Sequence, residues 1–221
     1  MKRPKTSVTD PAAGLRERKK RALRGELSLA ALRLAKQHGL SNVRTEDIVA
    51  AVGVSRRTFS NYFSNKYEAL SDRLVGRAQQ SAKVLRTRPR GEPLWQALNA
   101  ALIAPYEELV FDDSSKSREA TLLVLEDPSL RAELWKGALA AQHALAQAIA
   151  ERTGLDPDRE IYPSLLAATA HAAVMTALER WLRLKRPQPL SPMIREALEL
   201  LERGLPEPSR KGRTKMPRRF K

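Results

Sequence analysis

The sequence contains no cysteine, which excludes disulfide bonds, thiolate metal sites and thiol catalysis, and which is compatible with a reducing cytoplasm. Aromatic residues make up only 5% of the 221 residues, whereas alanine and leucine are abundant and alternating β-branched runs are missing. We find no apolar run approaching twenty residues and no signal-peptide pattern. Because 42% of the residues are hydrophobic, we expect a packed, cytoplasmic, all-α protein.

The motifs of the common enzyme classes are also missing. There is no GxSxG, no Walker loop, no GxGxxG and no zincin pattern. The carboxylate pairs Glu107-Glu108 and Asp112-Asp113 are adjacent in sequence, so they do not face each other on a helix. Neither His143 nor His171 belongs to an HxxxH or HExxH pattern. We therefore expect no enzymatic activity, no cofactor and no metal site.

Positive charge is present in excess and is unevenly distributed. Residues 1–70 hold 15 lysines and arginines against 6 acidic residues, and residues 206–221 hold 7 against 1. Residues 71–205 hold 18 of each, so the net charge of +15 lies at the two ends of the chain. Nucleic-acid binding needs such basic segments, because cations that neutralise phosphates release counterions. A basic surface that serves solubility alone is the alternative.

The stretch from Thr45 to Lys66, TEDIVAAVGVSRRTFSNYFSNK, predicts a helix-turn-helix. Thr45 is the expected N-cap of a first short helix, which Gly53 can end by taking the left-handed conformation. Ser55 can then cap a second helix through the backbone N–H of Thr58. The alternative is a helical hairpin with a purely structural role.

The second helix of this pair has one packing face and several polar faces. Phe59 and Phe63 lie four residues apart and point the same way, so they are expected to pack. We expect Arg56 and Arg57 to read base edges, because arginine pairs bidentately with guanine, and Tyr62 and Lys66 to hold phosphates. The predicted DNA-contacting residues are Arg44, Thr45, Ser55, Arg56, Arg57, Thr58, Ser60, Asn61, Tyr62 and Lys66.

From about Leu15 to Leu70 this pattern resembles the DNA-binding signature of the tetracycline-repressor (TetR) family. Ser60 departs from the pattern, since many members carry an aromatic residue there that grips the DNA backbone. The segment EDPSLRAEL and the ending ERWL resemble the mycofactocin-regulator-like subgroup. The family resemblance implies a nine-helix architecture, and the subgroup resemblance implies an effector with a long apolar part, such as an acyl-CoA.

The chain is expected to divide into five parts, namely a flexible basic arm (1–14), the helix-turn-helix head (15–65), a connecting helix and linker (66–90), an effector-binding and dimerisation body (91–205) and a disordered basic tail (206–221). Helices of the body are expected over 94–110, 118–126, 128–152, 159–185 and 191–203.

The first half of the helix expected over 15–38 is rich in cations, which could contact the phosphate backbone. They are Arg16, Arg18, Lys19, Lys20, Arg21 and Arg24.

The resemblance implies that the last two helices form a four-helix bundle with a second copy of the chain. The expected interface residues are Leu166, Ala173, Leu178, Leu182, Ile194, Leu198 and Leu201. If the apolar faces of these two helices point inward, the same residues would instead fill the core of one copy.

The middle helices are expected to hold the effector, with Trp95, Tyr106, Phe111, Leu122, Trp135, His143, His171 and Met175 as candidate lining residues. Ordinary core packing is the alternative for each of them.

The function that these expectations describe is a homodimeric transcriptional repressor, acting on the bacterial nucleoid, that a small apolar effector releases from a palindromic operator. An architectural or weakly specific DNA-binding protein without an effector is the alternative.

Overall fold

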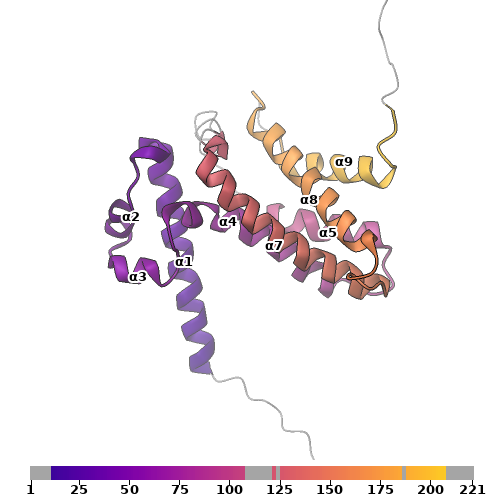
Figure 1. The fold of residues 1–221 in the computed structure, drawn as a ribbon, viewed down its shortest axis with the longest axis horizontal. Coiled ribbons are helices and arrows are strands. Elements are labelled where there is room, and N and C mark those ends of the chain that lie inside the picture. The colour runs from indigo at the N-terminus through magenta and orange to yellow at the C-terminus, as the bar shows by residue number, and fades with distance from the viewer. Residues whose placement is uncertain (1–10, 108–120, 123–124, 186–187, 208–221) are drawn as a thin grey trace, which may run out of the picture.

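The structure is a computed structural model that describes residues 11–107, 121–122, 125–185 and 188–207. Within these residues the chain forms eight α-helices, one short 3-10 helix and no strand, which confirms the all-α prediction (Figure 1). The expected count of nine included a helix over 118–126, most of which lies outside the described residues. The elements are α1 (Pro11–His38), η1 (Leu40–Asn42), α2 (Thr45–Val52), α3 (Arg56–Ser60), α4 (Lys66–Thr87), α5 (Leu94–Glu107), α7 (Pro128–Thr153), α8 (Ile161–Leu182) and α9 (Leu190–Glu202).

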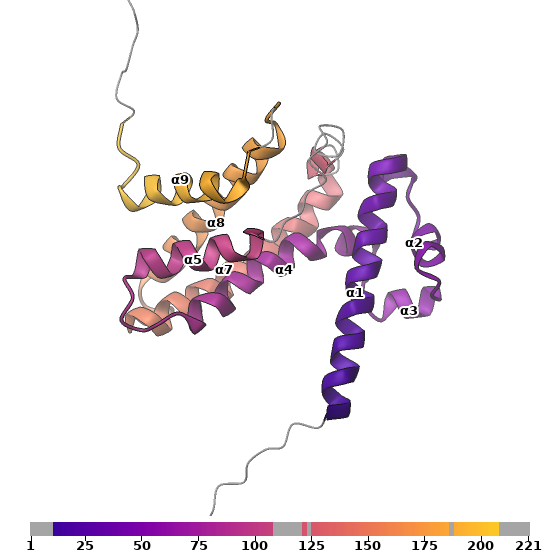
Figure 2. The same ribbon diagram turned by 180° about the vertical axis from the view of Figure 1, so that it is seen from behind.

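The head consists of α1, α2 and α3, which lie at one end of the molecule (Figures 1 and 2). Its core is small and closed, with Leu27, Ile48, Phe59 and Phe63 almost completely buried. The two phenyl rings lie 5.6 Å apart and tilted, an arrangement that suits aromatic pairs. The predicted packing face of the helix-turn-helix is thereby confirmed.

Helix α4 connects the head to the body and packs along α7 and α5 (Figure 2). The side chain of Asn65 caps its first turn by accepting a hydrogen bond from the Glu68 N–H, at 2.9 Å. The Pro/Gly-rich break after α4 is a short loop that α7 holds in place. There the Arg152 guanidinium donates hydrogen bonds to the carbonyls of Arg88, Pro89 and Glu92.

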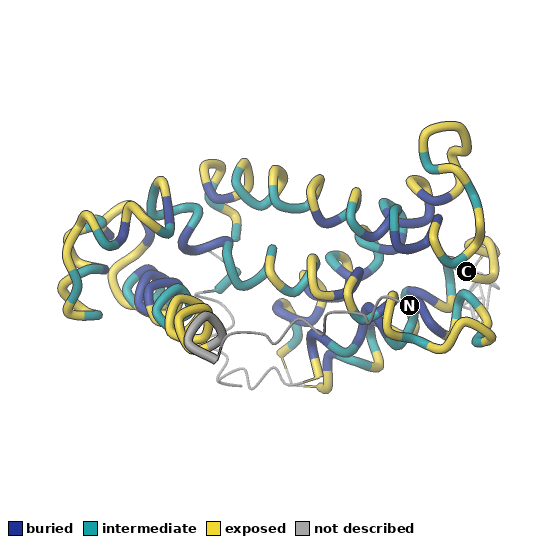
Figure 3. Tube along the Cα trace, turned by 90° about the horizontal axis from the view of Figure 1, so that it is seen from below, coloured by how far each residue is buried: buried dark blue, intermediate teal, exposed yellow. Residues whose placement is uncertain are grey.

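The body packs α5, α7, α8 and α9 around one large apolar core, with buried residues on the facing sides of the helices (Figure 3). The Asp127 carboxylate caps α7 by accepting from the N–H groups of Ser129 and Leu130, and α7 ends at Gly154, whose φ is 75°. Helix α8 is long and apolar enough to cross a membrane by length and hydropathy, a run that the sequence reading overlooked. Nine residues of α8 are buried, and eight of them contribute to the core of the body, which accounts for much of its apolar character.

The first turns of α7 also reach the core of the head. Leu130 is 1% exposed and packs in the same cluster as Phe63 and Leu70, and Leu134 packs against that cluster one turn later. Helix α7 therefore belongs to both cores, so the head contacts the body through α7 as well as through α4.

Candidate nucleic-acid interface and effector groove

The turn of the helix-turn-helix has the predicted geometry. Gly53 takes the left-handed conformation, with φ 75°, and its N–H donates to the Val49 carbonyl at 2.9 Å. The Ser55 hydroxyl accepts a hydrogen bond from the Thr58 N–H at 3.1 Å, which confirms Ser55 as the N-cap of α3. These two contacts fix the angle at which α3 leaves α2.

The start of α2 differs from the prediction. Thr45 is the first residue of the helix and not its N-cap, because Arg44 holds the extended cap position. The Asp47 carboxylate accepts the Arg44 N–H at 2.8 Å, so an acidic side chain within the first turn satisfies the free donor. Thr45 is half-buried and the Arg44 side chain is exposed beside the helix-turn-helix.

The outer face of α3 is open to solvent. Arg57, Ser60 and Asn61 are exposed there, and Thr58 is half-buried beside its cap. Arg56 is exposed as well but forms an ion pair with Glu46 of α2, with 3.0 Å between nitrogen and oxygen. Arg57 makes no ion pair within the described part of the chain, so its guanidinium is free to reach a base edge.

Two cations, Arg24 of the head and Lys66 at the start of α4, make contacts within the fold. The Lys66 ammonium donates to the carbonyls of Leu40 and Val43, at 2.9 and 2.8 Å. Arg24 pairs with Asp72 at 2.7 Å and lies over the Phe63 ring, 4.5 Å from its centroid. These contacts tie η1, α1 and α4 together and give both side chains a structural role, while the phosphate contacts expected of them stay a prediction.

Tyr62, the other expected phosphate contact, is half-buried and packs against the core of the head. Its carbonyl accepts a hydrogen bond from the Arg24 guanidinium at 3.0 Å. The backbone at the end of the helix-turn-helix is therefore fixed to α1, which holds α3 at a constant distance from that helix.

Three candidate effector residues line one groove between α4, α7 and α8. The groove has a volume of about 310 Å³ and a mostly apolar lining that includes Leu74, Trp135 and Met175. His171 faces it as well, and burial lowers the pKa of this imidazole, so the ring is neutral at pH 7. Gln142, Arg131 and Glu179 line the groove too, so a mostly apolar wall with a few polar side chains suits a small, largely apolar molecule that carries a polar group.

The other candidates do not join this groove. Tyr106 lies beside a smaller space of the body that shares Ala78, Gln142 and His171 with the groove, and burial raises the pKa of its hydroxyl. The neighbouring Arg77 has a pKa lowered to about 10 by burial and by Arg73, and it stays protonated at neutral pH. His143 is exposed on α7, which contradicts its predicted role, and Leu122 packs against the core. Phe111 lies outside the described residues.

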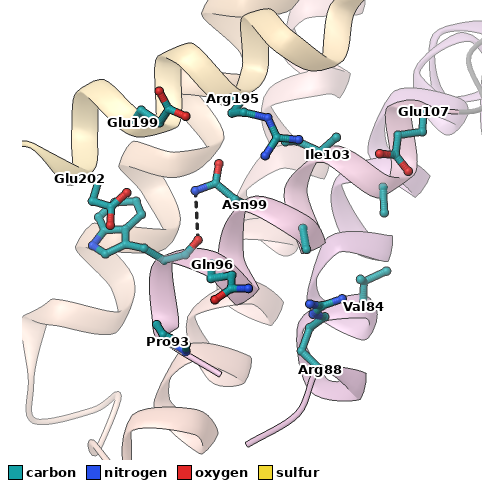
Figure 4. A pocket seen from close by; sticks show the side chains of 13 residues that line it. Val84, Arg88, Pro93, Gln96, Asn99, Ile103, Glu107, Arg195, Glu199 and Glu202 are labelled. Carbon is teal, nitrogen blue, oxygen red and sulfur yellow. Dashed lines mark hydrogen bonds between the residues drawn. The ribbon is translucent and has the colours of Figure 1, made fainter. Parts of the chain in front are cut away.

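Trp95 lines a second groove, of about 730 Å³, between α5, α9 and the end of α4 (Figure 4). Its wall is part polar and part apolar, and the Asn99 amide donates to the Trp95 carbonyl at 3.0 Å, one turn earlier in the same helix. Side chains of both charges surround it, namely Arg88, Glu107, Arg195, Glu199 and Glu202. Within the described residues no group of three or more His, Cys, Asp or Glu side chains could hold a metal ion.

The residues predicted for a dimer interface mostly fill the core of a single chain. Leu166, Leu178, Leu182, Ile194 and Leu198 are at most 6% exposed in one copy, so the prediction of an interface made by them is wrong. Ala173 and Leu201 are half-buried. The apolar stripes of α8 and α9 face inward because these two helices complete the core of the body.

Sequence reasoning missed the close approach of α4 to α7. A Cβ atom added at Gly137 would overlap the side chain of Val75 on α4, so only glycine fits there. The contact lies on the wall of the apolar groove, which Val75 and Ala138 line. A glycine within a long helical run was the available signal, since such a glycine often marks close packing.

Comparisons with known proteins agree with this architecture. The family model described as "Bacterial regulatory proteins, tetR family" matches residues 29–71, and the model described as "MftR C-terminal domain" matches residues 92–206. The HTH-type transcriptional regulator TcmR of Streptomyces glaucescens is 31% identical over 183 residues, which cover 80% of this chain and 81% of TcmR. MftR of Mycobacterium tuberculosis, named for mycofactocin biosynthesis regulation, is 28% identical over 159 residues, covering 71% and 78%.

Two solved structures share the fold. The fatty acid degradation regulator FadR from Bacillus halodurans superposes with a TM-score of 0.57 at 18% identity, covering 82% of this chain and 95% of FadR. SmeT, the repressor of the Stenotrophomonas maltophilia multidrug efflux pump SmeDEF, superposes with a TM-score of 0.54 at 21% identity, covering 84% and 96%.

Proposed function

The chain belongs to the TetR family of bacterial transcriptional regulators, and we propose that it is a homodimeric repressor that a small apolar effector releases from a palindromic operator. Its relatives and matched families are DNA-binding regulators and not enzymes. In keeping with that family, it acts in the cytoplasm, where we infer that it is associated with the nucleoid.

The observation that carries the DNA-binding part is the open outer face of α3. Arg57, Ser60 and Asn61 are exposed on a helix that the Gly53 turn and the Ser55 cap hold in a fixed orientation. A helix held in this way can enter the major groove, where arginine donates two hydrogen bonds to guanine. Arg56 reads a base once a guanine competes with Glu46 for its guanidinium.

The effector part rests on the apolar groove between α4, α7 and α8. Its volume of about 310 Å³ lies at the lower end of the range for small-molecule sites, about 300–1,000 Å³. Met175 and Trp135 suit an apolar ligand, and the neutral His171 can hydrogen-bond one polar group of it. The acyl part of an acyl-CoA has this chemistry.

Coupling between groove and head runs through two helices. Leu130 of α7 is buried in the core of the head, while Arg131, Leu134 and Trp135 line the groove within the next two turns. On α4, Leu74 and Val75 line the groove one turn after Leu70, which is also part of the core of the head. A ligand that separates α4 from α7 therefore moves both connections of the head. Because the DNA fixes the half-site spacing, such a movement misplaces one of the two recognition helices.

Dimerisation is needed because one head spans only one half-site, and half-sites lie about 34–36 Å apart. Exposed apolar side chains lie at the start of α8, where Ile161, Tyr162 and Leu165 are 78%, 44% and 55% exposed. We infer that this exposed face of α8 contacts the partner, while its inward face fills the core of the body.

The proposal is tested by selecting duplexes from a random library with the purified protein. We expect the selected sites to be palindromic and to bind two chains, with an affinity that falls when a saturating effector is added. Medium-chain acyl-CoAs are the first compounds to try, and Met175→Arg should abolish their effect by filling the groove. Selection that yields no common sequence would contradict the proposed repressor.

The alternative, an architectural DNA-binding protein, is favoured by the basic head and by the basic segment 206–221. It predicts similar affinities for selected and random duplexes at moderate salt, because phosphate contacts carry no sequence information. The same selection experiment therefore separates the two functions.

A further inference from the structure

The first half of α1 projects beyond the packed part of the head, past α3 (Figures 1 and 2). All residues from 15 to 22 are exposed, including Leu15, whereas the buried residues of α1 begin at Leu27. At 1.5 Å per residue, the twelve residues from Pro11 to Ala22 reach about 18 Å, which is about five base-pair steps of DNA. None of the residues from 15 to 22 is therefore packed against the rest of the molecule.

The projecting half is also dense in positive charge. Five of the six residues from Arg16 to Arg21 are cations, and Glu17 is the exception. Within the described residues Arg16, Lys19, Lys20 and Arg21 have no ion pair, in contrast to Arg24, which pairs with Asp72 at the edge of the core. Like charges three and four residues apart destabilise a helix, and an unpacked helix of this length is marginal in water. A polyanion beside it removes the repulsion.

We propose that the projecting half of α1 is a second DNA-contacting element, which lies along the phosphate backbone outside the half-site read by α3. The inference rests on the proposed DNA-binding function and extends it to the flanking duplex. Cations spread around the helix fit a backbone contact and not base readout, because phosphates present no sequence and accept a donor from many directions. The element therefore lengthens the bound site and adds affinity without changing base preference.

The test compares two variants that each lose three positive charges. Lys19→Gln/Lys20→Gln/Arg21→Gln changes the projecting half, and Lys83→Gln/Arg90→Gln/Arg180→Gln changes exposed positions of α4, the α4–α5 loop and α8. Each is titrated at several salt concentrations with the duplex selected from a random library, once trimmed to the palindrome and once extended by ten base pairs on each side.

For the wild type and the body variant, we expect the extended duplex to bind more tightly than the trimmed one. For the α1 variant we expect no gain from extension, and a salt slope smaller by about 0.9 for each lost phosphate contact, or roughly 5 for a dimer. An α1 variant that behaves like the body variant overturns the inference while leaving the repressor proposal intact. A wild type without preference for any selected duplex would instead overturn the proposed function.

Hydrogen exchange of the wild-type chain gives a second readout that needs no variant. Amides of residues 15–22 should become protected when the extended duplex is added and should stay unprotected with the trimmed duplex. Equal protection with both duplexes contradicts a contact outside the half-site.

Discussion

The head and the body of this protein differ in how tightly their helices pack and in the charge they carry. The head has a closed core, and its unpaired cations lie outside, on α3 and the first half of α1. The body is electrically neutral over residues 71–205 and leaves an apolar groove between its helices. A fixed, charged surface suits a rigid partner such as duplex DNA, whereas helices that leave space between them can adjust to a small molecule. Helix α7 takes part in both cores and is the element through which one region can affect the other.

The largest effect is expected from removing the side chain through which α7 enters the core of the head. Leu130→Ala should destabilise the protein by about 2–5 kcal/mol, because a fully buried leucine leaves a cavity between the two regions. Thermal unfolding should then show the head melting before the body. Leu139→Ala, at an exposed position of the same helix, is the matched control and should change little. Equal losses for both variants would show that Leu130 does not join the regions.

Substitution of Lys66 tests whether this cation stabilises the fold or contacts DNA. Lys66→Met should cost about 1–3 kcal/mol of stability, because it removes the donor for the Leu40 and Val43 carbonyls. Chemical denaturation measures this loss, and titration with random-sequence DNA measures the salt slope. Unchanged stability together with a smaller salt slope would restore the phosphate contact that the sequence suggested.

Gly137 lets α4 and α7 approach closely beside the groove. Gly137→Ala should push the helices apart and cost about 1–2 kcal/mol net, because overpacking exceeds the gain in helix propensity. The variant should also bind the operator more weakly without effector. Adding Val75→Ala should restore both properties by making room for the new methyl group. Additive effects of the two substitutions would contradict the contact.

The smallest effect is expected at His171 of the body, where burial of the imidazole makes the stability of the protein depend on pH. Its pKa is lowered in the folded protein by burial, so the unfolded chain binds more protons below about pH 6.5, the ordinary value for histidine. The stability that the neutral ring contributes is therefore present above that value and is lost as the pH falls through the folded pKa. His171→Gln should show a smaller loss of stability between pH 7 and pH 5. An unchanged pH profile would contradict the burial of a neutral imidazole.

Local sequence patterns predicted the helix-turn-helix well. Gly53, Ser55 and the spacing of Phe59 and Phe63 act within a few residues, so the sequence alone determines their roles. The cap of α2 was wrong by one residue, because the Asp47 carboxylate accepts the Arg44 N–H and so makes Arg44 the N-cap and Thr45 the first helical residue. The described helices of the body, α5, α7, α8 and α9, were also predicted to within a few residues from proline and glycine signals.

Contacts between distant segments could not be predicted in the same way. Lys66 and Arg24 were interpreted as surface cations. In the fold, Lys66 donates hydrogen bonds to two carbonyls that lie 23 and 26 residues away in the sequence, and Arg24 donates to an aspartate 48 residues away. The stripes of α8 and α9 carried no sign of whether they face a partner or their own core. Amphipathic spacing identifies a buried face but not what covers it, so both interpretations were consistent with the sequence.

The most direct test of sequence reading by α3 is the effect of Arg57→Ala on binding to a selected operator and to a shuffled duplex of the same length and salt. We predict that operator binding weakens by about 1–3 kcal/mol while binding to the shuffled duplex changes much less, so that the ratio of the two affinities falls. Equal losses on the two duplexes would contradict it, because Arg57 would then contact only the phosphate backbone.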